Sequence, residues 1–86
     1  MGDNYYSIIP IPVRYANISD KAKLLYAELT SLINGKGVCE VKYKSLEKIF
    51  RLTFFEVNTL IIELTEHDFI NHNGDDENLS IELLVL

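Results

Sequence analysis

The sequence predicts a mainly α fold of three helices followed by a small C-terminal β hairpin, with residues 1–86 forming a single domain. Three segments carry apolar residues at steps of three and four, the spacing that places them on one buried helix face. A run of polar turn residues near the end of the chain separates two β-prone stretches. Eighty-six residues, 48% of them hydrophobic, are enough for one core and too few for two domains.

Residues 1–17 are predicted to form an extended arm. The stretch 4–13 is rich in β-prone side chains, but Pro10 and Pro12 interrupt it. Because proline offers no N–H group to a β ladder, this stretch does not suit a central strand. An extended arm that lies on the domain accommodates both the β-prone residues and the prolines.

The first helix is predicted after this arm. Ser19 and Asp20 supply an N-cap, and Asn34-Gly35 ends the helix because glycine accepts the left-handed conformation of a C-cap. Apolar residues recur between these signals at helical spacing: Ala22, Leu25, Leu29, Leu32 and Ile33. The stripe predicts a helix of about four turns with one face in the core.

A short β-prone stretch, residues 38–41, and a second short helix, residues 44–51, are predicted next. In that helix Leu46, Ile49 and Phe50 are expected to face the core. Residues 51–53 then form a turn into the third helix. The two helices and this turn have the arrangement of a helix-turn-helix motif.

The third helix has the clearest start signal. Thr53 as N-cap and Glu56 three residues later form a capping box, and Leu52 and Val57 are placed for a hydrophobic staple. The residues that fill the core face of this helix are Val57, Leu60, Ile61 and Leu64. Because they share one face, the rest of the helix is expected to be exposed.

Residues 68–86 are predicted to form a hairpin. Phe69 and Ile70 begin one strand, residues 73–78 form a polar turn, and residues 80–86 form the return strand. An order of helix, helix, turn, helix and hairpin is that of a winged helix-turn-helix domain, in which the hairpin is the wing.

Four segments also point to a particular family. They are residues 5–10 (YYSIIP) with residues 13–15 (VRY), residues 22–30 (AKLLYAELT), residues 37–39 (GVC), and the ending from Leu64 through Phe69-Ile70. In these segments the chain resembles the N-terminal winged-helix domain of phage and plasmid replication initiators (replisome organisers) of Gram-positive bacteria. The resemblance covers nearly the whole chain. It implies a DNA-binding domain that acts as a replication initiator or transcription regulator.

The chain departs from that family where the third helix begins. The family usually has a serine, two basic or polar residues and then Thr-Val-Ser-Arg at this point, whereas residues 53–59 here read TFFEVNT. Phe54, Phe55 and Thr59 occupy positions that would carry cations facing DNA. Arg, Lys, Asn and Gln are the side chains that usually read base edges in the major groove. Only Asn58 remains as a candidate reader.

The outward face of the third helix has the composition of a protein interface. With the core residues pointing inward, Phe55, Thr59, Ile62 and Glu66 lie on the opposite side at about 100° per residue. Asn58 flanks them on one side, and Glu56 and Glu63 flank them on the other. The predicted partner-binding residues are Phe55, Asn58, Thr59, Ile62 and Glu66. A protein partner or a homodimer is expected. The alternatives are that the arm or wing covers Phe55 and Ile62, or that they wedge into DNA.

Charge is divided unevenly along the chain. Residues 1–51 carry eight basic and five acidic side chains, whereas residues 52–86 carry eight acidic and no basic ones. This division predicts weak DNA binding, because a polyanion is repelled by the C-terminal third. Phosphate contacts remain open for the second helix, through Lys42, Lys44, Lys48 and Arg51, although these residues also suit a solvated helix face. An acidic inhibitor that mimics DNA is a third hypothesis for the function.

No enzymatic, cofactor, metal or small-molecule site is expected. No nucleophile–base pair or glycine-rich phosphate loop stands out, and His67 and His72 lack the spacing of two metal ligands on one helix face. The single cysteine, Cys39, has no partner for an internal disulfide, which suits a reducing cytoplasm. The sequence shows no secretory signal and no apolar stretch long enough to cross a membrane. The expected location is the cytoplasm of a bacterial host cell.

Overall fold

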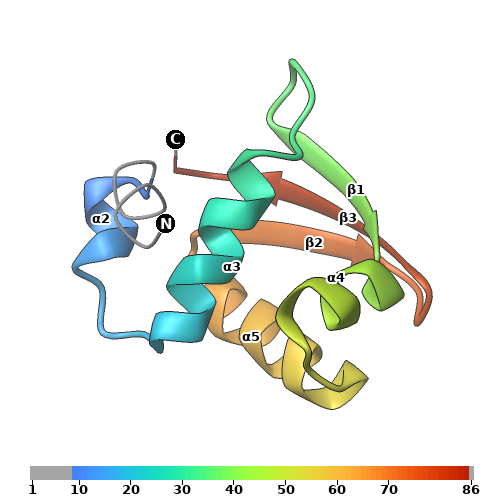
Figure 1. Ribbon diagram of the computed structural model, residues 1–86. Helices are drawn as coiled ribbons and strands as arrows, with labels where there is room; N and C mark the ends of the chain where they lie inside the picture. The colour runs from blue at the N-terminus through green and yellow to red at the C-terminus, as the bar shows by residue number, and fades with distance from the viewer. Residues whose placement is uncertain (1–8, 86) are drawn as a thin grey trace.

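Apolar stripes on three helices and one face of a three-stranded sheet meet in a common core (Figure 1). The computed structural model describes residues 9–85. The helices of this part are α2 (Ile11–Arg14), α3 (Asp20–Thr30), α4 (Tyr43–Phe50) and α5 (Phe54–Glu66), and its strands are β1 (Val38–Lys42), β2 (Ile70–Gly74) and β3 (Asn78–Leu83). The fold is a small α/β fold rather than a mainly α fold with a separate hairpin, because β1 joins the hairpin in one sheet.

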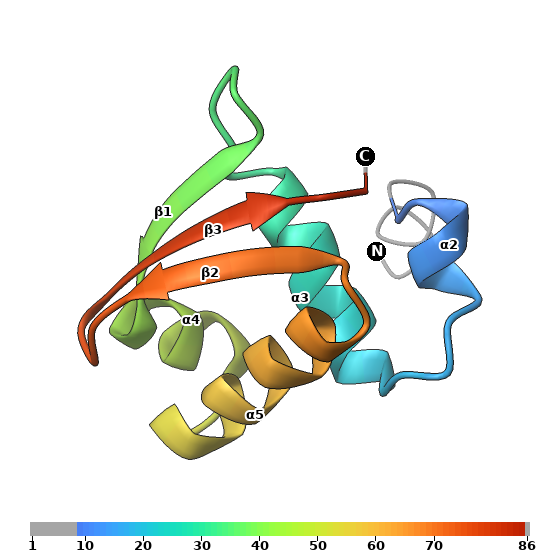
Figure 2. The same ribbon diagram turned by 180° about the vertical axis from the view of Figure 1, so that it is seen from behind.

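The sheet is antiparallel and has the order β1-β3-β2. Side chains alternate along each strand, so that one face is apolar. Cys39 pairs with Ile81, Ile70 pairs with Leu83, and all four are buried. The helices cover this apolar face, and Figure 2 shows the opposite face without a helix over it.

The predicted core faces of α3 and α5 are confirmed in their central turns. Both helices bury the expected residues, namely Ala22, Leu25 and Leu29 from α3 and Val57, Leu60, Ile61 and Leu64 from α5. Tyr26 of α3 is also fully buried, and its hydroxyl hydrogen-bonds both the carbonyl oxygen and the N–H of Val85. Burial raises the pKa of the Tyr26 phenol. This residue ties the segment after β3 to α3.

The predicted extended arm, residues 1–17, is wrong for its central part, and residues 1–8 lie outside the described residues. Ile11–Arg14 form α2, with Pro10 as N-cap and Pro12 in the first turn. Proline is tolerated there because N–H groups of the first turn need no helical partner. The turn buries Ile9 and Val13, and the Arg14 guanidinium donates to the carbonyl oxygen of Ile9 at 3.0 Å.

The end of α3 and the buried face of α4 also differ from the prediction. α3 ends at Thr30 rather than Ile33, and Leu32 in the following turn is 43% exposed instead of buried. The Thr30 hydroxyl donates to the backbone oxygen of Ala27, so a side chain takes part in closing the last turn. In α4, Ile49 is half exposed rather than inward, because this short helix buries Tyr43 and Leu46 against the core.

The hairpin has a tighter turn than predicted, and its return strand lies closer to that turn. β2 continues to Gly74 and β3 begins at Asn78 and ends at Leu83, so residues 75–77 connect the strands. The Asp75 carboxylate accepts hydrogen bonds from the N–H groups of Asn78 and Glu77, both at 2.8 Å, and these bonds lower the pKa of Asp75. A carboxyl with a lowered pKa stabilises the fold above its ordinary pKa, and that contribution is lost as the pH falls through the lowered value.

The start of α5 is confirmed. Thr53 Oγ1 accepts from the N–H of Glu56 at 3.2 Å, and the Thr53 N–H donates to Glu56 Oε1 at 3.0 Å. The hydrogen bond from the Thr53 N–H, followed by the Thr53 side chain, lowers the pKa of the Glu56 carboxyl. Leu52, before the cap, is partly buried against the core. The capping box therefore fixes the direction in which α5 leaves the turn.

We expect Thr53→Ala to lower the free energy of unfolding by about 1 kcal/mol, because the N–H of Glu56 loses its side-chain acceptor. Urea unfolding followed by circular dichroism measures this loss. Thr59→Ala is the matched control, since the Thr59 hydroxyl donates to a helical carbonyl, that of Phe55, and caps nothing. Equal effects of the two substitutions would show that the cap contributes nothing.

Candidate protein-binding surface on α5

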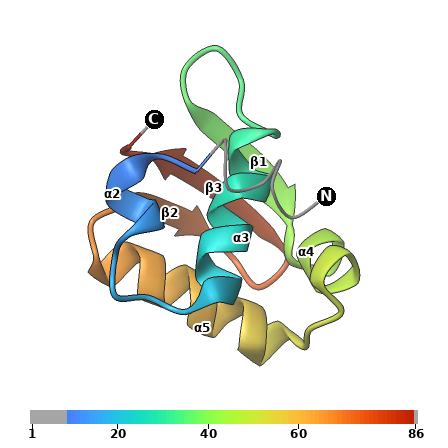
Figure 3. The ribbon, with the colours of Figure 1, turned by 60° about the vertical axis from the view of Figure 1, so that its left-hand side comes forward.

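α5 presents large apolar side chains on the face turned away from the core. Phe55 is 77% exposed and Ile62 is 44% exposed, whereas Val57, Leu60 and Ile61 on the other face are buried. Thr59 and Glu66 are also exposed. In Figure 3 the helix lies along the margin of the molecule, with α3 and the sheet on one side of it. We call Phe55, Thr59, Ile62 and Glu66 the α5 stripe.

The alternative that the arm or the hairpin makes Phe55 and Ile62 part of the core does not hold for the residues described. Residues 9–17 cover neither side chain, since Ile9 and Val13 pack into the main core instead. The hairpin does not bury them either, since Phe55 is 77% and Ile62 is 44% exposed. Phe55 and Ile62 therefore remain at the surface of this part of the chain.

Asn58, the predicted base reader, does not point freely outward. Its side-chain oxygen accepts a hydrogen bond of 2.9 Å from the hydroxyl of Tyr43, and the residue is half-buried. Tyr43 itself is buried, and that burial, followed by the charge of Asp76, raises the pKa of its phenol. Asn58 thus joins α5 to α4 and is absent from the exposed stripe.

An aromatic cluster that sequence reasoning missed supports the end of the stripe at Phe55. The rings of Tyr43 and Phe54 lie 4.5 Å apart between centroids, and Phe54 packs edge-on against Phe55 at 5.7 Å. Phe54 is partly buried against the core, so it does not occupy the exposed position that the comparison with a DNA-reading helix suggested. The exposed ring of Phe55 is thereby held against a fixed neighbour.

A groove of about 340 Å³ runs beside the α5 stripe, between α5 and the start of α3. Its lining consists of Ser19, Lys21, Leu52, Glu56, Thr59, Leu60 and Glu63. The Glu63 carboxylate accepts two hydrogen bonds of 2.8 Å, from the N–H and the hydroxyl of Ser19. Glu63 thus links α5 to the N-cap of α3, a role that its position as a flanking carboxylate did not reveal.

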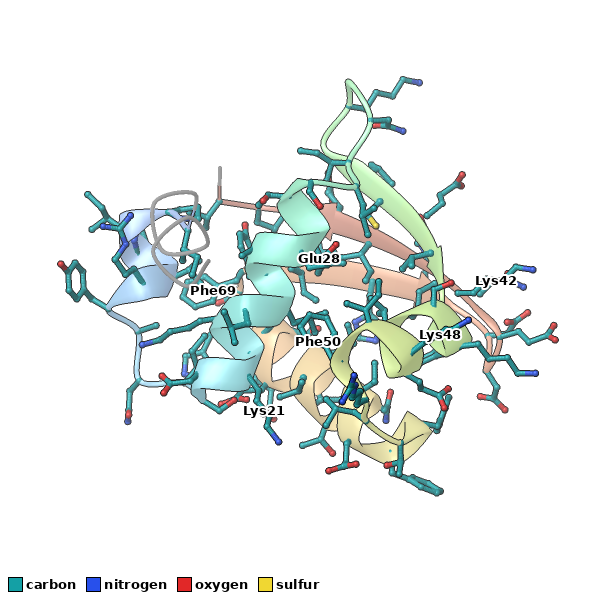
Figure 4. All side chains as sticks on the ribbon, in the orientation of Figure 1. Lys21, Glu28, Lys42, Lys48, Phe50 and Phe69 are labelled. Atoms are coloured by element: carbon teal, nitrogen blue, oxygen red, sulfur yellow. The ribbon has the colours of Figure 1, made fainter. Side chains whose placement is uncertain are left out.

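The predicted phosphate-contact residues belong to β1, α4 and the turn before α5, and not to the stripe itself. Lys42, Lys44, Lys48 and Arg51 are all exposed, and Figure 4 shows Lys42 and Lys48 on the side of the molecule formed by β1 and α4. A second groove, of about 620 Å³, lies here between β1, β3 and the start of α4, and its charged lining residues are Glu40 and Lys42. Opposite charges within one groove do not make a strong anion site.

The cysteine and the two histidines that were weighed as reactive or metal-binding residues all have neighbours within the fold. Cys39 is buried, and burial, then the charge of Glu40, raises the pKa of its thiol, so the reactive thiolate is disfavoured. His67 Nδ1 lies 3.0 Å from the carbonyl oxygen of Glu63, and His72 Nδ1 lies 2.9 Å from Thr65 Oγ1. Within residues 9–85, no three His, Cys, Asp or Glu side chains gather as a metal site would require.

A comparison of the chain with protein families, curated proteins and solved structures finds no match. Across residues 9–85, every helix is too short or too polar to cross a bilayer.

Proposed function

We propose that this protein is a non-enzymatic winged-helix module that acts by binding protein through the α5 stripe. The observation that carries the proposal is the 77% exposure of Phe55, together with Ile62 at 44% on the same helix face. Full burial of a side chain of this size is worth about 1.5–3 kcal/mol relative to leaving it in water. Large apolar residues clustered on one exposed face are typical of interfaces.

The element order supports the winged-helix part of the proposal. α3, β1, α4, α5, β2 and β3 follow one another as helix, strand, helix, helix, strand and strand, and β1 closes onto the hairpin through β3. In this assignment α4 and α5 are the helix-turn-helix motif and β2–β3 are the wing. The phage or plasmid origin rests on the family resemblance alone.

The charges support protein rather than DNA as the ligand of α5. The helix carries Glu56, Glu63 and Glu66 and no basic residue, and the hairpin after it is acidic as well. A recognition helix in the major groove normally brings Arg or Lys to phosphates and base edges. The one amide on α5, that of Asn58, already accepts a hydrogen bond from Tyr43.

The test is a double substitution of the stripe with a control matched in exposure. Phe55→Ser with Ile62→Ser removes an aromatic side chain exposed at 77% and an aliphatic one at 44%. Tyr15→Ser with Leu32→Ser removes a similar pair, at 78% and 43%, away from α5. Both variants should lose about 2 kcal/mol of stability or less, helix propensity included. Only the stripe variant should lose binding.

A photo-crosslinking amino acid at position 55, with position 73 as control, identifies what the stripe touches in Gram-positive bacterial cells. The captured protein is then purified and titrated with the wild type and the two double variants. Loss of at least about thirtyfold in affinity for the stripe variant alone, equivalent to one hot-spot residue, supports the proposal. Equal affinities for all three proteins, or a large stability loss of the stripe variant alone, would show that these residues are not a binding surface.

DNA binding is the second candidate function, favoured by the exposed basic residues of α4 and its flanks: Lys42, Lys44, Lys48 and Arg51. In helix-turn-helix docking, the first helix of the motif crosses the phosphate backbone. We expect the protein to bind random duplex DNA more weakly than about 10⁻⁶ M at about 0.15 M salt, because α5 and the hairpin supply no cations. A fluorescence anisotropy titration measures this, and sub-micromolar binding would favour a DNA-binding function instead.

A further inference from the structure

Resting on the proposed function, we infer that the partner of the α5 stripe is a helix of another protein, with an apolar stripe flanked by lysine or arginine residues. The apolar side chains of that helix lie on Phe55 and Ile62, and its cations face the carboxylates that stand between the stripe and the neighbouring groove. The inference draws on the spacing of the stripe, on the apolar lining of the groove, and on the position and charge of those carboxylates.

The α5 stripe has the spacing of a helix–helix seam. Its residues follow one another at steps of four, three and four: Phe55, Thr59, Ile62 and Glu66. Steps of three and four keep residues on one helix face, and they are the steps at which the side chains of two packed helices interdigitate. The stripe extends about 17 Å along the helix axis, which matches three turns of a partner helix. A helix therefore fits this face lengthwise.

The groove between α5 and the start of α3 adds apolar surface on one side of the stripe. Leu52 and Leu60 line this groove, and Thr59 belongs to both the groove and the stripe. Side chains that contribute most to binding usually fill such hollows rather than rest on a flat surface. A docked helix consequently contacts the exposed side chains of the stripe and can also place an apolar side chain in the groove.

Two carboxylates stand between the stripe and the groove, and hydrogen bonds to helix caps hold both of them. Glu56 Oε1 accepts from the N–H of Thr53 at 3.0 Å, and the Glu63 carboxylate accepts two hydrogen bonds of 2.8 Å from Ser19. A carboxylate has about four lone-pair sites, so both keep the capacity to accept from a cation of the partner. Because these side chains are already ordered, pairing with them costs less conformational entropy than pairing with a free surface glutamate.

The charges of this surface require a cationic partner. α5 carries Glu56, Glu63 and Glu66 and no basic residue. Among the described residues that line the groove, one is basic, Lys21, which Figure 4 labels at the start of α3, and two are acidic. A neutral helix would desolvate these carboxylates without pairing them, and an acidic helix would be repelled. Lysine or arginine beside the apolar stripe of the partner pairs with them instead.

The opposite flank of the stripe is uncharged. The side-chain oxygen of Asn58 accepts from the Tyr43 hydroxyl, and the Thr65 hydroxyl donates to the carbonyl oxygen of Ile61 at 2.8 Å. Recognition by charge is therefore confined to the side of the stripe that faces α3. The partner helix needs its cations mainly along that side.

Two synthetic helical peptides of about three heptads serve as probes. The lysine peptide has leucine at the two seam positions of each heptad and lysine at the two flanking positions, and the glutamate peptide has glutamate in place of every lysine. Fluorescence anisotropy of the labelled peptides, with up to about 1 mM protein at about 0.15 M salt, measures binding. We expect a dissociation constant of about 10–100 µM for the lysine peptide. The glutamate peptide should bind at least about tenfold more weakly, because attraction becomes repulsion.

Charge variants of the protein locate the contact. Glu56→Gln with Glu66→Gln removes two carboxylates of this surface, and glutamine at position 56 preserves the capping box, which accepts either residue. Asp76→Asn with Glu77→Gln, at exposed positions in the hairpin turn, changes the net charge equally and is the matched control. The first pair should weaken binding of the lysine peptide about fivefold, and the control pair less than about twofold. The stripe variant should lose at least about thirtyfold.

The results separate this inference from the proposed function. Equal binding of the two peptides, no binding of either at about 1 mM protein, or equal losses in the two charge variants overturns the cationic helix. Self-association of the wild type that the stripe variant loses also overturns it, because a second copy would then be the occupant. If position 55 captures a protein whose crosslinked segment is not a basic amphipathic helix, and the stripe variant loses that protein, the proposed function stands alone. A stripe variant that still binds both the captured protein and the lysine peptide would contradict both proposals.

Discussion

Ile61→Ala is expected to lower the free energy of unfolding by about 2–5 kcal/mol, whereas the same change at the adjacent Ile62 should cost about 1 kcal/mol or less. The two residues have the same side chain in the same helix, but Ile61 is fully buried and Ile62 is 44% exposed. At Ile61 the loss includes both the burial of the side chain and the cavity that remains. At Ile62 water already contacts much of the side chain.

Ile62→Ala serves as the control for Ile61→Ala, because the change in helix propensity is the same at both positions. Urea unfolding of dilute protein, below the concentration at which any dimer forms, measures the two losses without a contribution from association. Comparable losses at the two sites would mean that Ile62 is covered in solution. The α5 stripe would then be part of the core, and the proposed protein-binding function would not hold.

Gly74→Ala is expected to destabilise the protein by about 3 kcal/mol or more. Gly74 is the last residue of β2 and has a φ of +129°, a conformation that side chains rarely adopt. A Cβ atom there would lie far inside van der Waals contact with the carbonyl oxygen of Asn78. The turn itself would have to move, and with it the hydrogen bond from the Asp75 N–H to that same oxygen.

Gly35→Ala is the matched control, because a Cβ at Gly35 meets no heavy atom within 4 Å. That change should leave stability unaltered or raise it by up to about 1 kcal/mol, since alanine narrows the unfolded ensemble. Thermal unfolding of both variants, with amide exchange in the hairpin, provides the comparison. A Gly74→Ala variant as stable as Gly35→Ala would show that the hairpin turn is not built as described.

Substitutions in the α5 stripe and in the hairpin turn test different properties of the protein. The α5 stripe should affect association and not folding, and the Gly74 turn should affect folding first. The Glu63 carboxylate belongs to neither group, although it flanks the stripe, because its two hydrogen bonds to Ser19 join α5 to the start of α3. Substitutions at Glu63 are therefore poor probes of binding.

Local signals in the sequence determined the starts of α3 and α5 and the two faces of α5. The capping box of Thr53 and Glu56 spans three residues, and the core stripe from Val57 to Leu64 repeats within two turns. Both features depend only on residues that are neighbours along one helix, so they can be predicted directly from the sequence. The outward position of Phe55 and Ile62 follows from the same periodicity. The N-terminal prolines were ambiguous, because a β-prone stretch and the first turn of a helix both tolerate them.

Only the tertiary structure decided which residues meet across the chain. Glu63 bonds to Ser19 44 residues away, and Tyr26 bonds to Val85 59 residues away. The hydroxyl of Tyr43 removes Asn58 from the candidate base readers, although both residues look free in the sequence. Such contacts depend on the path of the chain between the partners and on the volume that the other side chains fill. No pattern of neighbouring residues encodes them, which is why the exposed stripe was predictable and the interactions that frame it were not.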